Sequence, residues 1–151
     1  MSKKVFIGVG HGGADPGAVA NGIKEKDANL EIALACAKAL ENNGVIVKLS
    51  RETDVTEDLT VRIKEANAFK PDLALDIHNN AGGGDGAEVY HARANSYDDA
   101  LAKNILDEIV KIGQNSRGAK TRLTSSGADY FGFIRTAWSK GLSADLLEVC
   151  F

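Results

Sequence analysis

Two of the three histidines in this 151-residue chain follow apolar runs that are typical of buried strands. His11 comes just after Val5–Val9, inside the glycine-rich stretch Gly10–Gly17. His78 directly follows Leu73–Ile77. Strands that end at the same edge of an α/β sheet bring the residues after them together above that edge. Because imidazole is the commonest protein ligand for zinc, the two histidines predict a metal site at one end of a sheet.

A zinc site with two histidines usually takes a carboxylate as its third ligand and leaves the fourth position to water. Glu25 is one candidate, because it lies after the His11 loop and just before an expected helix. The mixed-charge run 24–27 around it is equally typical of a solvated helix start. Three other acidic residues compete for the role on sequence grounds: Glu31, Glu52 and Asp76. Asp76, two residues before His78, also fits an outer partner of that imidazole.

Glu148 is a carboxylate inside the otherwise apolar run Leu146–Phe151. Burying a charge there is unfavourable unless it is paired or lies near a metal ion. One interpretation is a strand end at the rim of the sheet, where Glu148 reaches water. The other is a general base or acid beside a metal-activated water, since desolvation raises the pKa of a carboxyl group.

The third histidine and the two cysteines indicate structural roles. His91 lies inside the predicted strand 87–92 and is expected at the surface or on a face of the sheet. Cys36 and Cys150 form no C-x-x-C pair, and we expect two small buried side chains rather than a disulfide or metal ligands. The chain also lacks a G-x-S-x-G serine elbow, so no protein nucleophile rivals an activated water.

Gly8–Gly13 matches the G-x-G-x-x-G pattern of dinucleotide-binding turns. That turn requires a helix at the third glycine, so that the helix N-terminus meets the pyrophosphate. Here the next helix is expected only at about Asp27, and Asp15 places a negative charge where phosphate would bind. We therefore discount a nucleotide site and expect the glycines to allow close packing while His11 points into a cleft.

Apolar runs alternate with helical patterns along the chain. Strands are expected at residues 5–9, 45–49, 73–77, 87–92 and 146–151, with short extended segments at 119–123 and 131–134. Helices are expected at residues 27–43 with Asp27 as N-cap, after Asp58 as a second N-cap, and between Ser96 and Gly113. This alternation predicts an α/β fold, a sheet covered by helices on both faces.

Length and charge limit the classes of function. A chain of 151 residues corresponds to a single domain, and a net charge of −3 provides no basic surface for nucleic acid or for an anionic membrane. No apolar stretch is long enough to cross a bilayer. Met1–Val5 continues into a short strand pattern rather than the apolar core of an export signal.

Several segments together resemble one family, the catalytic domain of zinc-dependent N-acetylmuramoyl-L-alanine amidases of bacterial autolysins and phage endolysins. No single segment is specific, but their order along nearly the whole chain is. The matching segments are 10–18, 24–30, 49–54, Arg62 with 66–67, 76–81, 86–90, 117–120 and 147–149.

The resemblance implies a mixed, twisted sheet and an amidase catalytic domain over residues 1–151. It implies that His11, Glu25 and His78 bind Zn²⁺ and that Glu148 is the catalytic carboxylate. The substrate would be peptidoglycan, cleaved at the amide between the lactyl group of N-acetylmuramic acid and L-alanine of the stem peptide. It leaves the oligomeric state open.

The chain departs from the family pattern at three places. Asp76 stands where the family usually has serine, and Ala144-Asp145 stands where a proline is usual. Family domains also typically continue beyond the position of Phe151, so we expect a domain truncated at its C-terminus. Action on the bacterial cell wall without an export signal fits a phage endolysin, a mother-cell autolysin or an excised domain.

Two alternatives remain open from the residues. A zinc carboxypeptidase or deacetylase on a related sheet would use the same ligands but requires an arginine for a terminal carboxylate. Four arginines are available for that role: Arg51, Arg62, Arg117 and Arg135. A non-catalytic cell-wall-binding relative would keep the fold without turnover, and the presence of all four site residues disfavours it.

Overall fold

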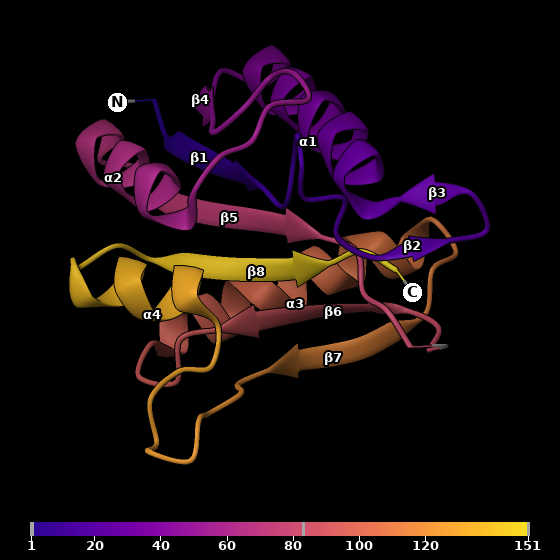
Figure 1. The fold of residues 1–151 in the computed structure, drawn as a ribbon. Helices are drawn as coiled ribbons and strands as arrows, with labels where there is room; N and C mark the ends of the chain where they lie inside the picture. Colours follow the sequence, from indigo (N-terminus) through magenta and orange to yellow (C-terminus); the bar gives the residue numbers. More distant parts are fainter. Residues whose placement is uncertain (1, 83, 151) are drawn as a thin grey trace.

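The computed structural model describes residues 2–82 and 84–150, excluding the side chains of residues 96 and 97. Within these residues six strands form one sheet in the order β4-β1-β5-β8-β6-β7, and two short strands form a separate hairpin (Figure 1). The strands are β1 (Lys4–Val9), β2 (Val19–Ala20), β3 (Ile23–Lys24), β4 (Ile46–Leu49), β5 (Leu73–His78), β6 (Ala87–His91), β7 (Ser116–Lys120) and β8 (Ala144–Glu148). The helices are α1 (Glu25–Asn42), α2 (Leu59–Phe69), α3 (Ser96–Lys111) and α4 (Gly132–Ser139).

The sheet is mixed. Strands β4, β1, β5 and β8 are parallel, β6 runs antiparallel to β8, and β7 is parallel to β6. β5 and β8 lie side by side at the centre, so that His78 and Glu148 are direct register partners at the strand ends. The prediction of one α/β domain with a mixed sheet is confirmed.

Helices cover both faces, as the alternating apolar pattern of the strands requires. On one face, Phe6 and Ala74 pack with residues of α2 and α4 such as Ile63 and Phe133. On the other face, the core includes residues of α1 and α3 together with alternate strand residues such as Ile7, Leu75 and Leu147. Asp76 and His78 lie on the same face of β5 as Ala74, and Glu148 is the register partner of His78. All three side chains therefore lie on the sheet face that α2 and α4 cover.

The start of the first helix is corrected. Helix α1 begins at Glu25 rather than after Asp27, and its N-cap residue Lys24 makes no capping side-chain hydrogen bond. The amides of Glu25 and Lys26 instead donate to the carbonyls of Ala18 and Pro16, at 2.8 and 3.1 Å. The backbone of the preceding loop therefore caps the helix, which side-chain capping signals in the sequence do not reveal. The Asp58 cap of α2 is confirmed, since its side chain accepts from the amide of Thr60 at 2.7 Å.

Three other boundaries differ from the predictions. Residues 131–134, predicted as extended, lead into helix α4, where Phe133, Ile134 and Ala137 are buried on one helical face. β7 begins three residues before the predicted 119–123 segment. β8 ends at Glu148, and Phe151 lies outside the described residues.

His91 and the two cysteines lie outside the group formed by His11, Glu25 and His78. His91 is buried on β6, so the sheet-face expectation is confirmed and the surface alternative is wrong. Cys36 and Cys150 are both free and only partly buried. The thiol of Cys150 donates to Oδ1 of Asn79 at 3.0 Å. Among the described residues, no helix combines the length and apolarity that crossing a membrane requires.

Candidate metal centre and active site

The glycine-rich loop after β1 brings His11 to the end of β5. The amide of Gly10 donates to the carbonyl of Ile77 at 3.0 Å, and His11 itself adopts a left-handed φ of 59°. A Cβ at Gly10 would lie 2.5 Å from the His78 ring, and one at Gly17 would lie 2.5 Å from Glu25 Oε2. These glycines leave room for the neighbouring side chains, which confirms the close-packing interpretation of the loop.

Three of the predicted ligands converge. One donor atom each of His11, Glu25 and His78 lies within 4.8 Å of the other two. Nε2 of His11 is 3.1 Å from Glu25 Oε2, and Nδ1 of His78 is 3.0 Å from Glu25 Oε1. Glu25 is only 6% exposed, at the first residue of α1, where the positive end of the helix dipole favours a carboxylate.

The competing carboxylates are separated from this group. Glu31 and Glu52 are exposed and do not belong to it. Asp76 is 2% exposed and lies 3.3 Å from Nε2 of His78, the ring nitrogen that does not face Glu25. Asp15 lies 2.8 Å from Nδ1 of His11 in the same way. Each imidazole therefore has one nitrogen toward the centre of the group and the other beside a carboxylate.

Hydrogen bonds fix the orientation of Glu25. Its Oε2 accepts from the amide of Ala18 at 2.9 Å, and its Oε1 accepts from the amide of Asn79 at 3.1 Å. The side-chain amide of Asn29 donates to Oε1 at 3.3 Å and to the carbonyl of Gly10 at 3.1 Å. The third ligand is thus held by the loop, by its own helix and by the segment after β5.

The charges of the group are mutually stabilised in the metal-free protein. Burial disfavours the ionised carboxylate of Glu25, but hydrogen bonds from the two imidazoles outweigh burial, so the pKa of Glu25 is lowered. The hydrogen bond to Glu25 raises the pKa of His11. Burial opposes protonation of His78, yet Asp76 and Glu25 together raise its pKa to about 10.

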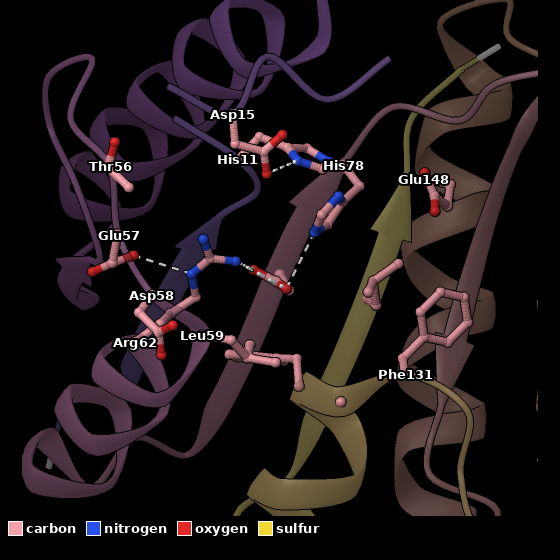
Figure 2. A pocket seen from close by; sticks show the side chains of 14 residues that line it. His11, Asp15, Thr56, Glu57, Asp58, Leu59, Arg62, His78, Phe131 and Glu148 are labelled. Carbon is pink, nitrogen blue, oxygen red and sulfur yellow. Dashed lines mark hydrogen bonds and ion pairs between the residues drawn. The ribbon is translucent and has the colours of Figure 1, made fainter. Parts of the chain in front are cut away.

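A buried ion pair between Asp76 and Arg62 lies beside the ring nitrogen of His78 that does not face Glu25. Nη1 of Arg62, on α2, donates to Asp76 Oδ1 at 3.0 Å, and Nε of Arg62 donates to Glu57 Oε2 at 3.1 Å. The charge of Asp76 is therefore compensated from within the protein. Figure 2 shows this chain of contacts, from Glu57 through Arg62 to His78.

Glu148 faces the same space from the neighbouring strand. A cavity of about 490 Å³ is lined by His11, His78 and Glu148 (Figure 2). Among the described residues, no group donates a hydrogen bond to the buried Glu148 Oε2. Burial raises the pKa of Glu148 to about 7. Glu148 is the last residue of β8 and is partly buried, which agrees with the strand-end interpretation. Its buried Oε2 and its place beside the histidines in the cavity also agree with a desolvated carboxylate.

The model of the N-acetylmuramoyl-L-alanine amidase family matches residues 5–151. The chain belongs to this family. An amidase of Bacillus licheniformis, CwlM, is 44% identical over 125 residues, covering 78% of this chain and 48% of CwlM. The endolysin of Bacillus phage SPP1 is 41% identical over 129 residues, covering 80% of this chain and 48% of the endolysin. The chain thus spans about half the length of these two relatives.

The fold is shared with solved structures. Cwp6 from Clostridium difficile superposes with a TM-score of 0.92 at 36% identity, over 100% of this chain and 25% of its own. The departures from the amidase pattern have local explanations in this structure. Asp76 is accommodated because Arg62 pairs with it, and Ala144 begins β8 in register with Ala74.

Arginines considered for a terminal carboxylate have other partners in this structure. Nη2 of Arg51 is buried and donates to the carbonyls of Gly10 and Lys26 at 3.2 and 2.7 Å. Arg62 and Arg117 are paired with acidic side chains, and Nη1 of Arg135 donates to backbone carbonyls. Sequence reasoning missed Asp15 as a partner of His11, although its position four residues after His11 was available as a signal.

Proposed function

We propose that this chain is a zinc-dependent N-acetylmuramoyl-L-alanine amidase that hydrolyses the amide between the lactyl group of N-acetylmuramic acid and L-alanine in peptidoglycan. His11, Glu25 and His78 bind the metal, and Glu148 moves the proton. The observation that carries the proposal is that those three donors converge and that His11 and His78 line the same cavity as Glu148, whose Oε2 has no hydrogen-bond partner among the described residues. Family membership supplies the substrate class.

The donor set fits Zn²⁺. Two imidazole nitrogens and one carboxylate are the ligands of catalytic zinc sites that keep one position open. The carboxylates of Asp15 and Asp76 fit the outer partners that orient metal-binding imidazoles. Asp76 is in turn neutralised by Arg62, so the buried site does not accumulate an uncompensated negative charge.

Amide hydrolysis requires a nucleophile at neutral pH and a proton for the poor leaving group. When bound, zinc supplies Lewis acidity, which polarises the carbonyl and makes water a stronger acid. Glu148 accepts the proton of the attacking water at Oε2 and then donates it to the departing alanine nitrogen. Leu59, Phe131 and Leu146 line the same cavity and exclude water around the scissile bond.

The proposed setting is the bacterial cell wall. The described chain corresponds to the catalytic domain of a cell-wall hydrolase, of the autolysin or endolysin type. A zinc carboxypeptidase is disfavoured, because each of the four arginines considered for its terminal carboxylate is engaged within the protein.

The deciding experiment compares Glu148→Gln with the wild type on purified cell walls. Release of L-alanine amino termini is measured with zinc content determined on the same samples. We expect the variant to lose activity by a factor of at least ~100 while it retains zinc. Glu41→Gln, a substitution at an exposed position of α1, is the matched control and keeps full activity. Full wall hydrolysis by Glu148→Gln, or wild-type hydrolysis that survives complete metal removal, contradicts the proposal.

A further inference from the structure

Glu88 is a second buried carboxylate beside Glu148, and the proposed function does not use it. The two residues are direct register partners on the antiparallel strands β6 and β8, and Glu88 is 2% exposed. Register partners of this kind project from the same face of the sheet, with their Cβ atoms about 4.5–5.5 Å apart. One row of successive register partners therefore runs across the sheet: Gly118, Glu88, Glu148 and His78.

The two carboxylates of this row differ in their partners. Oε2 of Glu88 accepts hydrogen bonds from Nε of Arg117, at 3.1 Å, and from Nζ of Lys120. Oε1 of Glu88 accepts from the hydroxyl of Tyr90 and from the side-chain amide of Asn80, both at 2.9 Å. The buried Oε2 of its register partner on β8, by contrast, has no hydrogen-bond partner among the described residues. Donors thus converge on one carboxylate, while the buried oxygen of its neighbour receives none.

The partners of Glu88 keep it ionised. Burial opposes ionisation, but the hydrogen bonds from Lys120, Arg117 and Tyr90 outweigh burial, so the pKa of Glu88 is lowered. Glu88 therefore carries the negative charge that holds the ammonium of Lys120. Within the part of the chain that the structure describes, Lys120 forms an ion pair with Glu88 alone.

Glu88 lies between Lys120 and Glu148. Strand β6 separates β7 from β8 in the sheet (Figure 1), and the hydrogen bond to Glu88 places Nζ of Lys120 at the level of the row that contains Glu148. The lysine side chain is 34% exposed and has a flexible aliphatic stem, so it is free to reorient. The next carboxylate along the row is Glu148, one strand spacing of about 4.8 Å further on.

We propose that Glu88 is a positioning residue that holds the ammonium of Lys120 on the β7 side of the row and so keeps Oε2 of Glu148 free of an ion pair. This inference rests on the proposed amidase function, in which that oxygen accepts a proton from water. An ammonium bound to the oxygen would occupy the accepting lone pair and stabilise the ionised carboxylate, which would make it a weaker base. The role of Glu88 is therefore electrostatic and acts through Lys120.

The position of Lys120 is tested by NMR on the isotope-labelled full chain, independently of activity. The nitrogen chemical shift of its ammonium is compared in the wild type, Glu88→Gln, Glu148→Gln and the double variant. We expect Glu148→Gln to move this signal several-fold further in the Glu88→Gln background, where Glu148 holds the ammonium, than in the wild type, where Glu88 holds it. An equal or smaller response in the Glu88→Gln background overturns the proposal.

The catalytic consequence is measured as kcat and KM for release of L-alanine amino termini from a soluble muramoyl peptide. Glu88→Gln keeps the shape of the side chain and removes its charge, so it should lower kcat by about 10-fold and change KM by less than about 3-fold. In a Lys120→Met background the same substitution should lower kcat by less than about 3-fold, because the competing ammonium is absent. Glu65→Gln, which removes the carboxylate partner of Lys48 away from the cavity, is the control and keeps the wild-type kcat.

Equal losses of kcat in the two backgrounds indicate that Glu88 acts through packing, and they overturn the proposal. If Glu88→Gln shows no melting transition, Glu88→Asp decides instead. Because this variant keeps the charge, a loss of kcat of more than about 3-fold overturns the proposal. Failure of the wild type to release L-alanine amino termini from walls overturns the amidase proposal, whereas the NMR comparison still decides which carboxylate holds Lys120.

Discussion

At the scale of single residues, His11 and His78 each face Glu25 with one ring nitrogen and a second carboxylate with the other. This arrangement fixes both imidazole rings before any metal binds. Asp15 does so from an exposed position, whereas Asp76 is buried and depends on Arg62. If zinc binds as proposed, the outer carboxylates are the residues through which metal affinity can be changed without touching a proposed ligand.

Asp15→Asn tests this role. The amide keeps one oxygen for the hydrogen bond from the Gly17 amide but removes the charge beside His11. We expect zinc affinity to fall by about 10- to 100-fold, measured by competition with a chromophoric chelator. Asp27→Asn, an exposed substitution in the first turn of α1, is the control and should bind zinc as the wild type does. Identical affinities for both variants would refute a role of Asp15 in holding the metal site.

At the scale of elements, α3 and β8 bury two acidic side chains against each other. Asp98 and Asp145 are both 0% exposed. Asp98 accepts from the hydroxyl of Ser143, but neither oxygen of Asp145 has a hydrogen-bond partner among the described residues. Burial, and to a lesser extent the charge of Asp98, raises the pKa of Asp145 to about 8. The contact between these two elements is therefore sensitive to pH.

The sign of this effect follows from linkage. The folded protein holds the proton of Asp145 more strongly than the unfolded chain, in which an aspartate has a pKa of about 3.9. Its contribution to the free energy of unfolding is complete below pH ~4 and is lost as the pH rises to about 8.

Asp145→Asn should remove this dependence. As the pH rises from 4 to 8.5, we expect the free energy of unfolding of the variant to rise by about 2 kcal/mol relative to that of the wild type. This corresponds to roughly 4–8 °C in melting temperature. The measurement is thermal unfolding across this pH range, with Asp107→Asn on the exposed face of α3 as the control. Parallel pH profiles for Asp145→Asn and the wild type would show that the carboxyl group of Asp145 does not titrate in the folded state.

At the scale of the whole molecule, the proposed metal site joins segments that are remote in the chain. His11 follows β1, Glu25 begins α1, and His78 ends β5, so only the folded chain presents all three donors. A ligand that binds the native state and not the unfolded chain stabilises the fold by mass action. Zinc is therefore expected to act on the stability of the entire domain.

Addition of zinc to the metal-free protein should raise its melting temperature. At a free concentration 100 times the dissociation constant, we expect a gain of about 2.7 kcal/mol, or roughly 5–10 °C. His78→Ala should abolish this shift. His91→Ala, which alters the histidine outside the ligand group, should keep the zinc-induced shift even when its own melting temperature is lower. A shift retained in His78→Ala would contradict the ligand assignment.

The sequence alone determined the α/β class, the strands that carry His11 and His78, and the anomaly of Glu148 in an apolar run. These follow from local periodicity and from the unfavourable burial of a charge, both of which are readable without coordinates. The choice of Glu25 over Glu31, Glu52 and Asp76 needed either the family resemblance or the fold.

Only the tertiary structure decided where α1 begins, that Glu25 meets both imidazoles and which cation compensates Asp76. Each of these depends on contacts outside the local pattern: backbone carbonyls of the preceding loop cap α1, Glu25 meets His78 from another element, and Arg62 pairs with Asp76. Local sequence signals carry no information about such pairings, because the partners meet only once the sheet has formed its strand order.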